Sequence, residues 1–185
     1  MKRLAIITIA TLACAHAAAE HTEPERRFVT TVYTNADTET FTRDSKHITG
    51  TIVNRHETLS YRAALTPDGL VTAIEVTASA RGQSIRMIYP LPKGTMPILG
   101  GSTALLEQIL RRARKVGGDS ISIPTLLVGP HATSNVFTVI GNGPDSLMLL
   151  DRTGDPNMAF HLAIDSTWHI TGGTIPVDGL KIEPL

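Results

Sequence analysis

Residues 100–123, GGSTALLEQILRRARKVGGDSISI, are the stretch that decides the fold of this chain. On a helical wheel the apolar residues of this stretch fall within one arc of about 140°, and polar side chains occupy the rest. Ser102 offers a hydroxyl cap at the front, and Gly117 supplies the glycine that commonly ends a helix. The pattern predicts one amphipathic α-helix over about 103–116, packed by its apolar stripe on a sheet. The stripe consists of Leu105, Leu106, Ile109, Leu110, Ala113 and Val116.

Short strands surround this helix on both sides in the sequence. Residues 57–65 alternate apolar and polar side chains, as a half-buried strand does, and the sequence TPDG at 66–69 is typical of a hairpin turn. The proline-rich segment 90–97 breaks the strand pattern before the helix. About ten short strands with hairpin-sized turns predict a mainly β fold, a strongly curved antiparallel sheet that forms a half-barrel or barrel.

The amino-acid composition limits which classes of protein this chain can belong to. The chain has 185 residues, 17 basic against 17 acidic side chains, 42% apolar residues and 4% aromatic residues. Balanced charge and few rings argue against a nucleic-acid partner. We expect a flexible segment at 20–26 and a single β-rich domain over 27–185. The local basic cluster on the helix indicates a solvated helix end better than a phosphate-binding patch; it consists of Arg111, Arg112, Arg114 and Lys115.

The first residues have the pattern of a secretory signal. A basic start at 1–3 precedes an apolar run at 4–13 and small residues at 15–19. Residues 1–19 are therefore predicted to be a signal peptide, which places the mature protein in the periplasm or outside the cell. Cys14 lies in a sequence similar to a bacterial lipobox, so a lipid anchor on this cysteine is the alternative. No further apolar run is long enough for a transmembrane segment.

The sequence carries no catalytic or metal-binding motif. Its histidines are scattered singly, so we expect no metal site and no cofactor. Whether the chain is an enzyme stays open, with a non-enzymatic role favoured. For a hydrolase or isomerase, the candidate group is His161 and His169, facing each other across a hairpin, together with Asp165.

A curved sheet covered by a helix encloses an apolar space, which either fills with side chains or holds a ligand. Several residues expected to point inward are small, among them Gly50 and Ala63, and this favours a cavity. The candidate ligand-binding residues are Leu105, Leu106, Ile109, Leu110, Ala113, Tyr61 and Ala63.

The chain resembles bacterial envelope proteins of the half-barrel type, namely lipoprotein-carrier (LolA/LolB-like) and domain-of-unknown-function 3108 proteins. The residues that carry the resemblance are 101–106 entering the helix, 117–124 leaving it and 174–182 at the end. In the carrier proteins an apolar concave face receives acyl chains, and the resemblance implies no more than that.

Together these observations predict an exported envelope protein that binds a lipid or acyl chain in the concave face of its sheet. Two alternatives stay open. One is a non-catalytic interaction or scaffold domain with a filled core, which acts on an envelope protein partner. The other is a hydrolase or isomerase whose site is not recognisable from any sequence motif.

Overall fold

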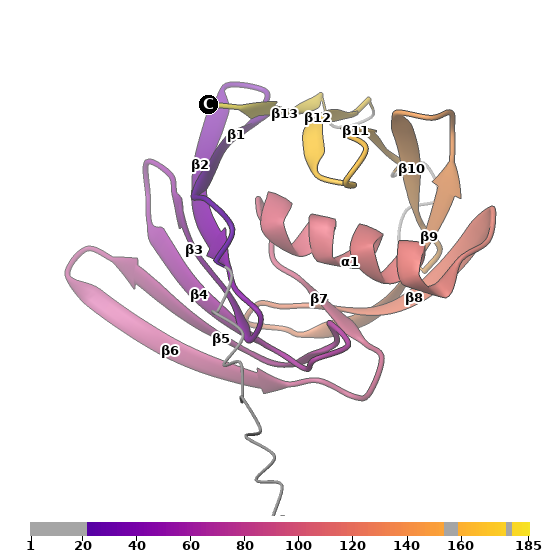
Figure 1. The fold of residues 1–185 in the computed structure, drawn as a ribbon. Coiled ribbons are helices and arrows are strands. Elements are labelled where there is room, and N and C mark those ends of the chain that lie inside the picture. The colour runs from indigo at the N-terminus through magenta and orange to yellow at the C-terminus, as the bar shows by residue number, and fades with distance from the viewer. Residues whose placement is uncertain (1–21, 154–158, 177–178) are drawn as a thin grey trace, which may run out of the picture.

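One continuous sheet curves around one helix in the part of the chain that the structure describes (Figure 1). This computed structural model describes residues 22–153, 159–176 and 179–185, so the predicted signal peptide and Cys14 lie outside it. The strands are β1 (Arg26–Val32), β2 (Asn35–Arg43), β3 (His47–Val53), β4 (Thr58–Leu65), β5 (Val71–Ala80), β6 (Gln83–Pro90), β7 (Met96–Ile98), β8 (Ser120–Leu127), β9 (Thr133–Gly141), β10 (Ser146–Asp151), β11 (Ala159–Ile164), β12 (Ile170–Ile175) and β13 (Leu180–Pro184), and the helix is α1 (Thr103–Val116).

The order of the strands shows how two meanders join. Strands β1 to β6 follow one another outward from the middle of the sheet, β13 to β7 do so on the other side, and β1 pairs with β13. All these pairs are antiparallel except β7 with β8, which are parallel and connected through α1. Strands β6 and β7 form the two edges, so the sheet is curved but not closed.

Helix α1 begins and ends where the sequence predicts. Ser102 is its N-cap, and the hydroxyl of this residue accepts a hydrogen bond from the backbone N–H of Leu105 at 3.3 Å. At the other end Gly117 has a φ of 76°, and its N–H donates to the carbonyl of Ala113. The predicted fold, a curved antiparallel sheet with this one helix packed on it, is confirmed. Among the described residues no helix combines the length and the hydrophobicity needed to cross a membrane.

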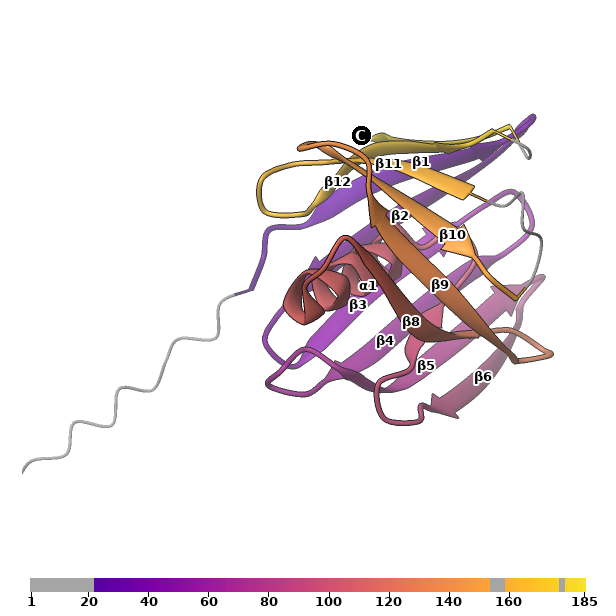
Figure 2. The same ribbon diagram turned by 90° about the vertical axis from the view of Figure 1, so that its right-hand side faces the viewer.

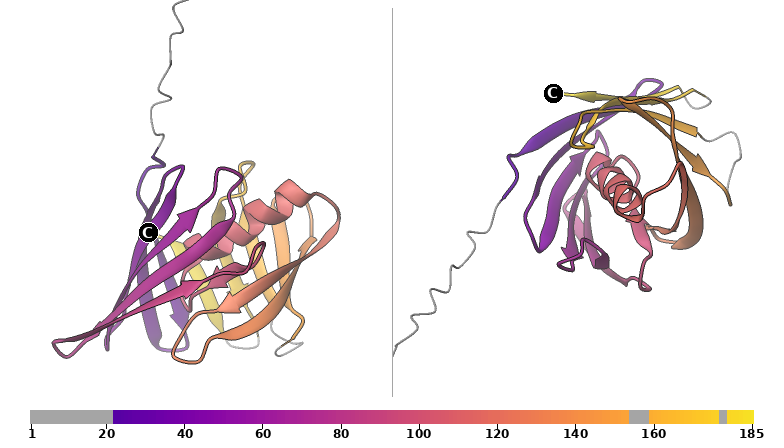
Figure 3. Two further views of the ribbon diagram at one scale, coloured as in Figure 1. Left: turned by 90° about the horizontal axis from the view of Figure 1, so that it is seen from below. Right: turned by 45° about the vertical axis from the view of Figure 1, so that its right-hand side comes forward.

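The core lies between α1 and the concave face of the sheet, which wraps around the helix (Figure 3). Successive residues along the strands point to opposite faces. In β11, for example, Leu162 and Ile164 are buried while His161 and Ala163 are exposed. The sheet therefore turns one apolar face toward the helix. Core side chains that are at most 1% exposed include Phe28, Ile48, Ile52, Ile74, Leu149, Leu162, Leu105, Ile109 and Leu110.

The segment before the helix differs from the sequence prediction. Where proline suggests a break, Met96–Ile98 forms the short strand β7, paired in parallel with β8 at Met96↔Thr125. Pro97 is compatible with this strand because β7 is an edge, where a missing N–H leaves no ladder partner unsatisfied. The sheet therefore contains one parallel pair that the antiparallel prediction did not include.

Candidate functional site

The curved sheet has two ends, and different side chains line each of them. At one end lie the turns 44–46, 66–69 and 165–169 and the C-terminal half of α1. The other end is formed by residues 98–103, which lead into α1, and by the ends of seven strands. These are the last residues of β1, β8, β10 and β12 and the first residues of β9, β11 and β13. The first end is termed the charged end and the second the apolar end. In Figure 2 strands β8 and β9 pass in front of α1, and β11 and β12 lie above it.

A cavity of about 310 Å³ lies at the apolar end, between the start of α1 and the inner faces of β8 to β13. Two of its walls are the rings of Phe137 and Phe160, which meet edge to face with centroids 5.9 Å apart. This volume lies at the lower end of the range found for small-molecule sites. The apolar side chains that line the cavity are Ile98, Leu99, Leu106, Leu127, Phe137, Phe160, Ile175, Leu180 and Ile182.

One polar side chain in the cavity wall lacks a partner. Thr103 is 1% exposed, and its Oγ1 makes no hydrogen bond. By contrast, Asn135 donates from Nδ2 to Oδ2 of Asp151, the lining carboxylate, at 2.8 Å. A buried hydroxyl without a partner costs free energy, and a hydrogen bond to a bound molecule removes that cost. The cavity thus combines an apolar wall with a hydroxyl that no protein atom satisfies.

A buried carboxylate from β2 holds the start of α1 beside this cavity. Oε2 of Glu39 accepts from the backbone N–H groups of Thr103 at 2.6 Å and Ala104 at 3.3 Å. Oε1 accepts from the hydroxyls of Tyr61 at 2.6 Å and Ser102 at 2.8 Å. Burial raises the pKa of Glu39, although the four hydrogen bonds act in the opposite direction. A carboxylate at this position suits the positive end of the helix dipole.

Tyr61 reaches this carboxylate because Gly50 leaves room for its ring. The two residues face each other in the β3–β4 register, and a Cβ on Gly50 would lie 2.4 Å from the phenol oxygen. The small residue at this position was expected to leave space for a ligand. It accommodates the Tyr61 ring instead.

At the charged end a second buried carboxylate joins α1 to the sheet. Glu107 has no exposed surface and forms ion pairs with Arg26 of β1 and Arg43 of β2. It also accepts from the backbone N–H of Ile170 in β12 at 2.8 Å. Arg43 donates to the carbonyl of Ala104 at 3.1 Å. These contacts connect the helix to three strands at once.

Glu23 extends this network toward the surface. Its carboxylate lies 3.2 Å from a guanidinium nitrogen of Arg43 and 2.8 Å from one of Arg111. Partial burial works to raise the pKa of Glu23, but the positive charges of Arg43 and Arg111 outweigh it and hold the pKa below its ordinary value. The N–H of Glu23 also donates to the carbonyl of Arg43 at 2.7 Å. The described part of the segment expected to be flexible, 22–26, is therefore attached to the sheet.

The predicted ligand-binding residues divide between the cavity and the core. Leu106 lines the cavity at the apolar end. The other candidates are at most 4% exposed, and none of them lines that cavity, because α1 fills the concave face against which its stripe packs. These core residues are Leu105, Ile109, Leu110, Ala113, Tyr61 and Ala63.

The predicted histidine pair does not form. The β11–β12 register places His161 opposite Thr174, and His161 is exposed on the outer face of the sheet. His169 instead lies at the charged end, 2.6 Å from Arg111 and 3.4 Å from Asp165. The prediction that His161, His169 and Asp165 converge is wrong. The hydrolase or isomerase hypothesis is therefore left without the site proposed for it. Within residues 22–153, 159–176 and 179–185, no cluster of three or more His, Cys, Asp or Glu side chains is placed to hold a metal ion.

Comparison with known proteins informs the fold. No protein-family model matches this chain, and no curated protein matches it either. The chain is similar to a crystal structure of a DUF1089 family protein from Pseudomonas aeruginosa, with a TM-score of 0.54 over 90% of this chain and 95% of that one. The two sequences are 13% identical. This likeness shows a shared fold.

Proposed function

We propose that this protein binds an apolar ligand, such as an acyl chain, in the cavity at the apolar end, and that it acts without catalysis. The observation that carries the proposal is the unfilled volume of about 310 Å³ in an interior that α1 otherwise fills. Burial of the guest supplies the driving force, about 0.8 kcal/mol for each methylene group removed from water.

The Thr103 hydroxyl adds a preference for a ligand with a polar atom. It has no partner in the protein, and it lies in the wall of an otherwise apolar space. A chain that carries an oxygen atom satisfies this hydroxyl, whereas a pure hydrocarbon leaves it unpaired. The ligand class is therefore an amphiphile whose polar atom lies near the start of α1.

The predicted signal peptide supports a location in the periplasm or outside the cell, where envelope lipids supply such chains. Intact mass of the protein isolated from an expressing bacterium tests this. A mass that begins at Glu20 supports export, a lipid-modified Cys14 supports the anchored form, and an uncleaved chain contradicts both.

The binding proposal is tested by titration with N-phenyl-1-naphthylamine, a neutral fluorescent apolar probe, and by native mass spectrometry for co-purified lipid. Leu180→Trp fills the cavity from β13, and Lys181→Trp places the same ring on the outer face one residue away. We expect at least about tenfold weaker probe binding for Leu180→Trp and no change for Lys181→Trp.

A clean apo mass together with no probe binding contradicts the proposal. That result favours the alternative of an interaction domain, which one observation supports. Strand β6 is a sheet edge, and on it Ile85 and Ile88 are 64% and 60% exposed.

A further inference from the structure

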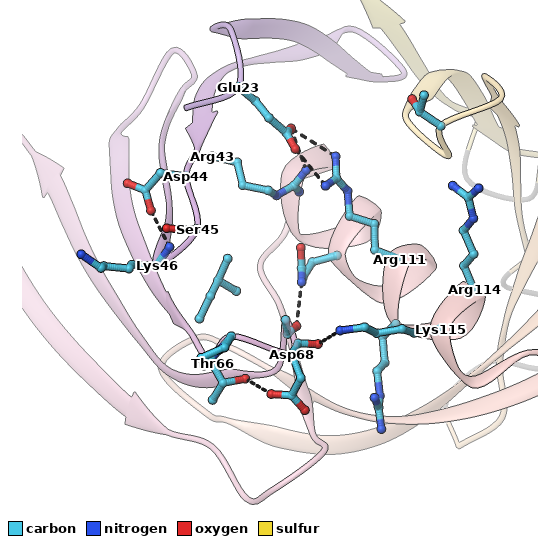
Figure 4. A pocket seen from close by; sticks show the side chains of 16 residues that line it. Glu23, Arg43, Asp44, Ser45, Lys46, Thr66, Asp68, Arg111, Arg114 and Lys115 are labelled. Atoms are coloured by element: carbon cyan, nitrogen blue, oxygen red, sulfur yellow. Dashed lines mark hydrogen bonds and ion pairs between the residues drawn. The ribbon is translucent and has the colours of Figure 1, made fainter. Parts of the chain in front are cut away.

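A second hollow lies at the charged end, and the apolar ligand does not account for it. This cleft of about 910 Å³ is bounded by α1 and by the turns 44–46 and 66–69 (Figure 4). Six basic side chains line it against three acidic ones, whereas the whole chain balances 17 of each sign. The excess of positive charge is therefore local. The basic residues are Arg43, Lys46, Arg111, Arg112, Arg114 and Lys115.

The three carboxylates of the cleft are already engaged. Glu23 lies between two of the arginines. Asp44 accepts from the backbone N–H of Lys46 at 2.7 Å, and Asp68 accepts from the hydroxyl of Thr66 at 2.5 Å (Figure 4). These hydrogen bonds lower the pKa of Asp44 and the pKa of Asp68. Asp44 and Asp68 thus stabilise the turns in which they lie, and Glu23 bridges Arg43 and Arg111. The cleft keeps an excess of positive charge.

Several groups in the cleft have unused hydrogen-bonding capacity. Arg43 is 4% exposed, and its Nε–H has no acceptor; the buried Nε–H of Arg111 has none either. The guanidinium group of Arg112 makes no hydrogen bond with the described residues, although its charge helps to lower the pKa of Asp68. Buried donors of this kind cost free energy when unpaired, and an oxyanion offers several strong acceptors at once. These groups indicate an anionic ligand.

Gln108 indicates a second property of that ligand. This residue is 4% exposed, and its Nε2 donates to the carbonyl of Gly69 at 2.7 Å, which leaves Oε1 as an acceptor without a donor. An acceptor among arginines repels an oxyanion but pairs well with a hydroxyl group. The ligand therefore carries both negative charge and a hydroxyl.

We propose that this cleft binds a small phosphate monoester that bears a hydroxyl group, of which glycerol 3-phosphate is the simplest example. The cleft and the apolar cavity share no lining residue, and the buried stripe of α1 separates them, so one small molecule does not occupy both. The inference therefore stands independently of the apolar ligand. It also revises the sequence interpretation of the basic cluster, because Arg111 and Arg112 line a cleft instead of a fully solvated helix end.

Isothermal titration of the protein with glycerol 3-phosphate at low ionic strength tests the site. Arg112→Gln and Lys115→Gln each remove a cation from the cleft, and Arg86→Gln on β6 and Lys181→Gln on β13 remove matched exposed cations elsewhere. We expect the Kd to rise about tenfold for each cleft variant and to stay unchanged for the controls. Added salt should weaken binding. No binding by the wild-type protein, or an equal loss in the controls, overturns the proposal.

Two further measurements define the ligand. Gln108→Leu should weaken binding of glycerol 3-phosphate several-fold more than binding of inorganic phosphate; an equal effect on both overturns the hydroxyl assignment. Vesicles of phosphatidylglycerol and of phosphatidylcholine separate the two sources of the glycerol phosphate group. Phosphatidylglycerol is a phosphodiester, so competition by its vesicles alone overturns the monoester assignment in favour of a lipid headgroup that carries a phosphate and a hydroxyl. Absence of competition supports the site with a free phosphate monoester.

Discussion

Two buried glutamates fix α1 at the two ends of the sheet, and their surroundings differ in kind. Glu39 receives only uncharged donors, from hydroxyls and backbone N–H groups, whereas Glu107 is paired with two arginines. The apolar end therefore positions the helix without bringing a cation to the cavity. At the charged end one of the two paired arginines, Arg43, also lines the basic cleft. The two ends thus compensate a buried carboxylate in different ways, with uncharged donors at Glu39 and with arginines at Glu107.

The largest effect is expected from breaking the ion pairs at the charged end. Glu107→Ala leaves Arg26 and Arg43 without their buried partner and should cost about 3–5 kcal/mol of unfolding free energy, measured by urea denaturation. Glu75→Ala, which breaks an exposed pair with Arg86, serves as the control and should change stability little. Similar losses in both variants would contradict the structural role assigned to Glu107.

A smaller loss should follow from disturbing the cap at the apolar end. Gly50→Ala forces the Tyr61 ring away from Glu39 and should cost about 1–3 kcal/mol in the same assay. Gly172→Ala is the matched change in β12, where the nearest atom to the new methyl is 3.6 Å away. That variant should unfold at nearly the wild-type urea concentration, and a loss as large as that of Gly50→Ala would argue against the cap.

Removal of an unpaired hydroxyl should raise stability. Thr103→Val and Thr125→Val each delete a buried Oγ1 without a partner and should each gain about 1 kcal/mol. Only Thr103 lines the cavity. Decanol should therefore bind more weakly to Thr103→Val than to the wild type, and it should bind to Thr125→Val as tightly as to the wild type. Decane, which lacks the oxygen atom, serves as the control ligand. If both variants lose decanol affinity equally, the cavity hydroxyl does not recognise the ligand.

The smallest effect is a difference in pH dependence between the two ends. The pKa of Glu39 is raised, so the wild type should lose stability relative to Glu39→Gln as pH rises above the ordinary value of 4.5. The pKa of Glu23 is lowered, so its contribution is complete above 4.5 and disappears as pH falls through the lowered pKa.

Urea unfolding between about pH 3 and pH 8 measures both difference curves. As pH rises, wild type minus Glu39→Gln should fall and wild type minus Glu23→Gln should rise. Slopes of the same sign would show that the two carboxylates do not differ as described.

The sequence is informative where the signals are local. Helix α1 follows from its apolar stripe, Ser102 and the glycine stop, all within one short stretch. What the stripe faces is not local. The wheel assigns Glu107 and Gln108 to the polar side, yet they are 0% and 4% exposed, because the sheet wraps around more than one side of the helix.

Local sequence patterns do not predict which residues contact α1 either. Glu39 caps a helix that begins 64 residues later, and Arg26 reaches a glutamate 81 residues away. The residues that line the apolar cavity come from β1, from β7 to β13, from the segment before α1 and from the start of α1, so no periodicity groups them. Of the candidate ligand residues only Leu106 lies there, since the same apolar stripe that predicts a binding face also builds the core.

The pairing of β1 with β13 has a consequence for the order of assembly. The two halves of the sheet meet through the first and the last strands, and the edges β6 and β7 come from the middle of the chain. A nascent chain therefore exposes the β1 edge until residues 180–184 leave the ribosome. Because this pairing closes a loop that spans the whole sheet, it should form slowly. Deletion of Leu180–Pro184 should leave the two meanders unjoined.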